Sequence, residues 1–168
     1  MSVAYVGLGS NLGHPRRRLA RALTELRRLP RSRLIAASPN YLTAPLGSEE
    51  AQPDYVNAVV VLRTALPPAA MLHQLRAIER RHGRMRRNGE PRNAPRVLDL
   101  DLLLFGRRRL SHSRLTVPHP RLHQRAFVLR PLLDIAPAVT IPGRGAARPW
   151  LREVRSQRIA RTRTAHWR

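Results

Sequence analysis

The sequence contains no cysteine and no lysine among its 168 residues. The absence of cysteine excludes disulfide bonds, zinc–thiolate sites and thiol nucleophiles. The absence of lysine excludes the lysine of a phosphate-binding P-loop, Schiff-base chemistry and a Ser–Lys pair. No apolar run approaches the roughly 20 residues that span a bilayer, and no basic stretch precedes an apolar segment at the start. We therefore expect a soluble protein of the cytoplasm.

Acidic residues are also scarce, since 32 arginines stand against 10 aspartates and glutamates and the formal net charge is +22. Such a charge can mark a nucleic-acid-binding protein, because arginine neutralises phosphates. It can also arise from a coding bias that places arginine where surface lysine would serve. The arginines are spread along the whole chain, and only 4% of residues are aromatic, which leaves few side chains for base stacking. Both observations favour the second interpretation.

The hydrophobic pattern predicts one domain with a βαββαβ order. The chain is 42% hydrophobic, which is enough for a buried core at this length. Two helices with apolar residues at helical spacing begin at Pro15 and Pro67. Short apolar runs predict four strands, over residues 3–8, 34–38, 56–62 and 96–105. This order is that of the ferredoxin-like α+β fold, an antiparallel sheet with helices packed on one face.

Further along the chain, the pattern predicts two shorter helices, around residues 125–135 and 149–159. Segments 39–53 and 83–95 are longer than most loops, and both adjoin predicted strands. Loops of this length in a compact domain are usually lids or binding loops, so we expect them to enclose a ligand. We also expect a domain boundary that separates residues 1–143 from an arginine-rich, partly mobile extension, residues 144–168, which adds affinity for polyanions and little else.

Asp99 and Asp101 form the most distinctive pair in the sequence. Alternate side chains of a strand share a face, so both carboxylates should point the same way while Leu98, Leu100 and Leu102 point to the core. Two carboxylates at this spacing suit Mg²⁺, which takes one or two carboxylates together with phosphates and water. The alternative is a solvated strand face whose aspartates pair with the arginines just upstream.

Other polar motifs carry less information. The glycine-rich residues 7–13 do not fit a dinucleotide-binding loop, because Leu12 stands where the third glycine is required, so we expect a tight turn from strand to helix. Asn57 is polar within an apolar strand and, if buried, needs hydrogen-bond partners. His119 lies between two prolines, which excludes a helical metal-binding pair with His123.

Six stretches, taken together and in order, resemble the family of 6-hydroxymethyl-7,8-dihydropterin pyrophosphokinases. They lie between residues 3 and 137 and read AYVGLGSNLG (4–13), QPDYVNA (52–58), IE with GRMR (78–79 and 83–86), PRVLDLD (95–101), LTVPH (115–119) and RAFVL (125–129). The resemblance implies an ATP-dependent enzyme of folate biosynthesis. Members transfer the terminal pyrophosphoryl group of ATP to the hydroxymethyl oxygen of the pterin and release AMP.

The same resemblance implies roles for individual residues. Asp99 and Asp101 would hold two Mg²⁺ ions that bind the ATP phosphates, and the transition-state arginines would be Arg84 and Arg96. ATP contacts would be made by Glu79, Arg86, Arg114, Thr116, His119 and Arg125. Pterin contacts would be made by the loop Thr43, Ala44, Pro45 and Leu46, by Tyr55 and Asn57, and by Phe127, which would stack on the ring.

Three positions depart from the family pattern. Asn93 stands where a loop tryptophan is common, Pro120 where a tyrosine commonly follows the histidine, and Arg76 where a glutamine is often found.

A rival interpretation is a non-catalytic, arginine-rich RNA-binding module, because the same sheet topology also serves RNA recognition. The strand aromatics that such a sheet uses are absent from residues 56–62 and 96–104, and two carboxylates would repel phosphate. We therefore expect ATP and 6-hydroxymethyl-7,8-dihydropterin as the partners, with no membrane and no specific nucleic acid, and a monomer.

Overall fold

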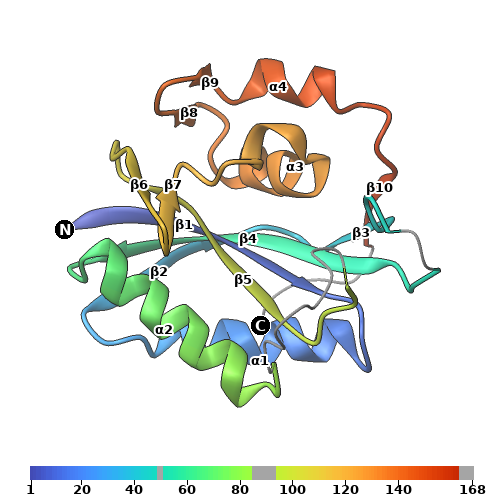
Figure 1. Ribbon diagram of the computed structural model, residues 1–168, viewed down its shortest axis with the longest axis horizontal. Coiled ribbons are helices and arrows are strands. Elements are labelled where there is room, and N and C mark those ends of the chain that lie inside the picture. The colour runs from blue at the N-terminus through green and yellow to red at the C-terminus, as the bar shows by residue number, and fades with distance from the viewer. Residues whose placement is uncertain (49–50, 85–93, 163–168) are drawn as a thin grey trace.

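The centre of the molecule is an antiparallel sheet with helices on both of its faces (Figure 1). The structure is a computed structural model, and it describes residues 1–48, 51–84 and 94–162. The sheet has the order β10-β3-β4-β1-β5, and β2 also pairs with β4. These strands are β1 (Ser2–Ser10), β2 (Ser32–Ala37), β3 (Tyr41–Thr43), β4 (Tyr55–Thr64), β5 (Asp99–Phe105) and β10 (Ile159–Arg161).

The strand order confirms the predicted βαββαβ unit. β1 lies between β4 and β5, and β2 and β3 pair with successive parts of the other edge of β4, all antiparallel. Helices α1 (Pro15–Arg27) and α2 (Pro68–Arg81) cross one face. Each helix begins with proline, whose fixed φ suits a first turn, and each presents apolar residues at helical spacing to the sheet.

The opposite face of the sheet is covered by the C-terminal half of the chain. Helix α3 (Ala126–Ile135), a short 3₁₀ helix η1 (Leu122–Gln124) and α4 (Arg148–Glu153) lie above it, with the hairpin of β8 (Thr140–Ile141) and β9 (Gly145–Ala146). The hairpin of β6 (Leu110–His112) and β7 (Leu115–Val117) instead packs against β5 and α2, and Val117 belongs to the core beneath α1 and α2. Val59, Leu103 and Leu104 point into this second core. The expectation of helices on one face was therefore wrong for α3 and α4, because β4 and β5 are apolar on both faces.

Two short strands were missed in the sequence. β3 lies inside the predicted loop 39–53, where Tyr41 and Thr43 are buried against β4. β10 follows α4, which ends at Glu153 rather than near residue 159. Both strands have three residues, too few for a periodic pattern, and each is defined by a partner far away in sequence.

The described part of the arginine-rich segment, residues 144–162, is packed against the rest of the molecule. Ala147 and Val154 are buried in the second core, and Trp150, Leu151 and Ile159 pack around them. The expectation of a separate appendage is wrong for these residues, because the apolar side chains of α4 pack against α3 and η1. The domain boundary at residue 143 stays a prediction. Among the described residues, no helix has the length and apolar character needed to cross a membrane.

A chain that ends at Gly143 should therefore be less stable than the full chain. The truncation removes buried Val154 and the partly buried Trp150 and Leu151, so we expect a loss of about 3 kcal/mol and a melting temperature lower by about 10 °C. The control is a chain that ends at Thr162, which keeps every contact named above. Equal melting temperatures for the two truncated chains would contradict the packing.

Candidate functional site

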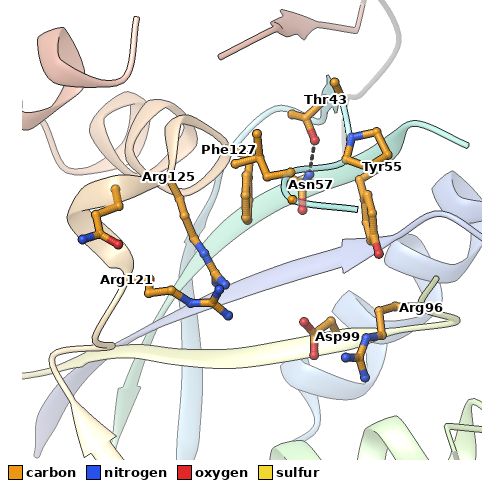
Figure 2. A pocket seen from close by; sticks show the side chains of 13 residues that line it. Thr43, Tyr55, Asn57, Arg96, Asp99, Arg121, Arg125 and Phe127 are labelled. Atoms are coloured by element: carbon orange, nitrogen blue, oxygen red, sulfur yellow. Dashed lines mark hydrogen bonds between the residues drawn. The ribbon is translucent and has the colours of Figure 1, made fainter. Parts of the chain in front are cut away.

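A cavity of about 280 Å³ opens between the loop that follows β3 and the start of α3, above the ends of β4 and β5 (Figure 2). One wall is the loop 43–47, and the opposite wall is the turn that leads into α3. The lining residues are Thr43, Ala44, Pro45, Leu46, Gly47, Tyr55, Asn57, Arg96, Asp99, Arg121, Gln124, Arg125 and Phe127.

Two glycines of β1 form the floor of this site. Gly9 pairs with Asn57 of β4 on one side and with Asp99 of β5 on the other, and Gly7 pairs with Asp101. A Cβ atom on Gly9 would lie 2.8 Å from Asn57 Oδ1, which is closer than such atoms approach. A smaller hollow of about 40 Å³ lies over both glycines and reaches Asp101. The glycines thus leave room that any other side chain would fill.

Asn57 is held in one orientation at the centre of the cavity. The side chain is buried, and its Nδ2 donates a hydrogen bond of 2.6 Å to Thr43 Oγ1 (Figure 2). An amide has two N–H donors and a carbonyl acceptor, so the second N–H and Oδ1 stay available to a ligand. Phe127 lies beside it as an apolar ring, and Tyr55 donates from its hydroxyl to the Ala94 carbonyl at 3.2 Å.

The two aspartates lie on one face of β5, as predicted, while Leu98, Leu100 and Leu102 are buried on the other face. Arg84 Nη1 contacts both the Asp99 carboxylate and Glu79 Oε1. Burial opposes the charge of Arg84, but Asp99 and Glu79 raise its pKa above the ordinary value. The alternative interpretation was that the aspartates pair with the arginines just upstream, and Asp99 does pair with one of them, Arg84.

Glu79, a residue of α2, forms an ion pair with Arg84. It is 3% exposed, and its Oε1 also accepts a hydrogen bond of 2.8 Å from the Leu100 N–H. Helix α2, strand β5 and the start of the loop at residue 84 are thereby connected through one buried carboxylate.

Asp101 is the more strongly perturbed carboxyl group. Its side chain is 35% exposed, but the surrounding protein and the charge of Asp99 raise its pKa to about 7. Arg125 Nη1 lies 3.7 Å and His119 Nε2 3.9 Å from Asp101 Oδ2. Burial and the positive charge of Arg125 and of Arg121 lower the pKa of His119 to about 4, so this imidazole is neutral near pH 7.

Arg121 and Arg125 extend across the cavity toward one another (Figure 2). The Arg125 guanidinium also lies 5.3 Å from the centre of the Phe127 ring, which favours a cation–π contact. Burial and the neighbouring Arg121 lower the pKa of Arg125 from its ordinary value. The site therefore has a positive side, made by these arginines, that faces the two carboxylates.

Asn11 fastens both long loops to the end of β1. Its Nδ2 donates to Gln52 Oε1 at 2.8 Å and to the Pro53 carbonyl at 3.0 Å. Its Oδ1 accepts from the Arg96 N–H at 2.8 Å, and its own N–H donates to the Arg96 carbonyl at 3.1 Å. Ser10 adds a hydrogen bond of 2.6 Å to the Val97 carbonyl. The Ser-Asn pair that resembled a simple turn thus positions the cavity walls.

The structure brings most of the predicted site residues together. The cavity collects the whole set predicted for the pterin and also Arg96, Asp99 and Arg125, while Asp101 lies in the adjoining hollow. Glu79 and Arg84 lie behind Asp99. Among the described residues, no group of three or more histidine or acidic side chains could hold a metal.

Some predicted ATP contacts lie elsewhere. Thr116 lines a second hollow of about 670 Å³ beside the β6–β7 hairpin, together with His119. Arg114 is exposed at the hairpin turn. Arg86 and Asn93 lie outside the described residues.

Three lining residues, Gly47, Arg121 and Gln124, were not predicted from the sequence. Arg121 and Gln124 are three residues apart, which places them on one side of the 3₁₀ turn, but that turn was itself not predicted.

The comparisons with known proteins agree with this geometry. A family model described as 7,8-dihydro-6-hydroxymethylpterin-pyrophosphokinase matches residues 5–137. The 2-amino-4-hydroxy-6-hydroxymethyldihydropteridine pyrophosphokinase of Pseudomonas aeruginosa is 49% identical over 138 residues, which cover 82% of this chain and 83% of that protein. The enzyme of the same name from Haemophilus influenzae is 43% identical over 144 residues, 84% of this chain and 86% of that protein. The chain belongs to the 7,8-dihydro-6-hydroxymethylpterin-pyrophosphokinase family.

Solved structures support the fold. The chain is similar to the wild-type HPPK-DHPS of Plasmodium falciparum with SDX-DHP, with a TM-score of 0.66 at 15% identity. A second HPPK-DHPS, in complex with substrates, gives a TM-score of 0.67 at 17% identity. The match covers 91% and 90% of this chain but only 43% of each solved chain, so this chain spans less than half of their length.

The glycine floor can be tested with a matched pair of substitutions. Gly9→Ala should push Asn57 away from Thr43 and lower the affinity for a pterin about ten-fold or more, because the new Cβ would lie 2.8 Å from Oδ1. Gly7→Ala adds the same methyl group to the floor without this clash, since its Cβ meets only the Leu103 side chain, at 3.5 Å or more, and its loss should be smaller. Pterin titrations of both variants measure the difference, and equal losses would contradict a specific role for the contact between Gly9 and Asn57.

The raised pKa of Asp101 predicts a pH-dependent stability for the metal-free protein. A carboxyl whose pKa is higher in the folded chain stabilises the fold while protonated, and this contribution is lost as the pH rises from about 4 through about 7. His119, with a pKa lowered to about 4, acts in the opposite direction, and its effect is complete above pH 6.5.

Thermal unfolding in a chelator, between about pH 5 and 8, should therefore isolate Asp101 when the unaltered chain is compared with Asp101→Asn, because the effect of His119 is common to both. The melting temperature of the unaltered chain should fall relative to that of Asp101→Asn as the pH rises to about 7. Parallel curves would contradict the raised pKa.

Proposed function

We propose that the cavity is the site where a pyrophosphoryl group passes from ATP to 6-hydroxymethyl-7,8-dihydropterin, which yields the pterin diphosphate and AMP in folate biosynthesis. Family membership supports the activity. The observation that carries the assignment to this site is that every residue predicted for the pterin lines one cavity next to the aspartate pair. The hydroxymethyl oxygen bonds to the β-phosphorus of ATP, the bond from that phosphorus to the bridging α–β oxygen breaks, and the hydroxyl proton is released.

The pterin is a flat heterocycle with hydrogen-bonding edges. Asn57 offers a donor and an acceptor to such an edge, and Thr43 prevents the amide from turning over. Phe127 provides a stacking surface and Tyr55 closes the side nearest residue 94. Pro45 and Leu46 complete the apolar wall. These residues bind and orient the pterin and exclude water from the reacting oxygen.

The donor pair fits Mg²⁺. Two carboxylates share one face of β5, and the charge of Asp99 helps to raise the pKa of Asp101, so a cation between them relieves a repulsion. Mg²⁺ takes one or two carboxylates and completes its shell with phosphates and water. We assign Asp99 and Asp101 as the ligands of two Mg²⁺ ions, which would neutralise charge on the ATP phosphates when bound.

The arginines would stabilise charge on the transferring group. Arg96 and Arg125 line the cavity, and Arg84 contacts the Asp99 carboxylate, which supports a role for all three in binding phosphate oxygens beside the pair. Transfer of this kind depends on positioning and charge neutralisation rather than on a protein nucleophile. Arg84 and Arg96 are assigned to the transition state, and Arg125 and His119 to ATP. Contacts of ATP with Glu79, Arg86, Arg114 and Thr116 stay predictions.

The rival RNA-binding function has no support from the relatives, which are named as pyrophosphokinases. A monomer and a cytoplasmic location stay predictions.

The test is AMP formation from ATP that requires both Mg²⁺ and 6-hydroxymethyl-7,8-dihydropterin. Asp99→Asn and Asp101→Asn should each lower kcat about 100-fold or more, because the cation loses a charged ligand. Melting temperatures should not fall by more than a few degrees, since Arg84 keeps Glu79 as its partner in the first variant.

Glu153→Gln is the matched control, an exposed carboxylate on α4 that should leave turnover unchanged. Active but destabilised aspartate variants would show instead that the pair serves only the fold.

A further inference from the structure

The segment that follows α4, residues 157–161, connects the two walls of the cavity. From α4 the chain descends past the start of α3 to the edge of the sheet, where β10 pairs with β3 (Figure 1). The family model ends at residue 137, so its match does not include this segment. We refer to residues 157–161 as the C-terminal strap.

Gln157 holds the wall that carries Arg125 and Phe127. Its Oε1 accepts a hydrogen bond of 2.8 Å from the Ala126 N–H, and its Nε2 donates one of 2.8 Å to the Gln124 carbonyl. One amide therefore bridges the backbone groups on both sides of Arg125, the residue that caps α3. The Ala126 N–H is one of the first in α3, which have no partner inside the helix, and the glutamine amide carries both the acceptor and the donor that the two hydrogen bonds require.

The next residues of the strap hold the opposite wall. The Arg158 carbonyl accepts from the Ala44 N–H at 3.3 Å, and Ile159 is paired with Thr43. The Arg158 guanidinium lies 2.7 Å from Asp54, the neighbour of Tyr55. This ion pair is exposed and adds little by itself, so the backbone pairing carries the connection.

We propose that Gln157 is a positioning residue for substrate binding, because its amide fixes the turn that presents Arg125 and Phe127 to the cavity. The inference rests on the proposed function and concerns residues outside the family match. Gln157 is not among the residues that line the cavity. It acts through the Gln124 carbonyl and the Ala126 N–H, while the following strand of the strap ties that turn to Thr43.

The test compares Gln157→Ala, Gln157→Glu and the control Ser156→Ala in the full chain. Ser156 is exposed and takes no part in the two hydrogen bonds that Gln157 makes. Gln157→Ala should raise the KM for the pterin about ten-fold and change kcat no more than about three-fold, because loosened contacts weaken binding more than the transfer itself. Gln157→Glu keeps the acceptor for Ala126 but cannot donate to Gln124, so its KM should lie between those of the unaltered chain and Gln157→Ala.

Melting temperatures and pterin titrations separate positioning from a structural role. A Gln157→Ala chain that melts lower but has the KM and pterin affinity of the unaltered chain would overturn the inference. If that variant does not fold, Gln157→Glu decides, and an unchanged KM would again overturn it. An unaltered chain that forms no AMP would instead contradict the proposed function, which keeps the two failures distinct.

Discussion

The placement of two carboxylates side by side on β5 is the constraint around which the site is built. Like charges this close raise the pKa of Asp101, and the cost is reduced only by positive charge nearby. Three arginines provide this positive charge: Arg84 after α2, Arg125 at the start of α3, and Arg96 just before β5. None of these contacts would be required by a sheet that served only as a scaffold. This repulsion agrees with the proposed metal site, because a bound cation would relieve it and would in turn attract the ATP phosphates.

The central strand β1 serves the core and the site at once because its side chains alternate. Val6 and Leu8 are buried under α1 and α2, whereas Gly7 and Gly9 face the cavity and leave it open. Beyond the strand, Asn11 connects the loops that form the walls. One short stretch of sequence thus sets the depth of the cavity and the position of its rim, which explains why a motif of small residues ends this strand.

Much of the fold could be predicted from local pattern, and the missing parts have a common cause. The hydrophobic pattern predicts the helices, whose apolar residues recur at helical spacing, and the long apolar strands. The alternation of side chains along a strand predicts that Asp99 and Asp101 share one face. β3, β10 and the contact of Gln157 with Ala126 depend on partners far away in sequence, which periodicity does not encode. The pterin residues came from the resemblance rather than from pattern. Neither the sequence pattern nor the resemblance predicted Arg121 and Gln124, because they belong to an irregular turn whose position depends on how α3 packs.

The arginines of the site differ from the exposed arginines that give the chain its large positive charge. Arg84 and Arg125 expose only 10% and 15% of their side chains and contact carboxylates, so the planar guanidinium is required there by geometry. By contrast, Arg158 exposes 70% and Arg81 56%, and at such positions a lysine would serve as well. A net charge of +22 would still draw polyanionic ATP toward the molecule, an effect that salt screens. Recognition in the proposed site would depend on the few arginines that the fold holds in place, so an arginine-rich composition is compatible with a small-molecule site.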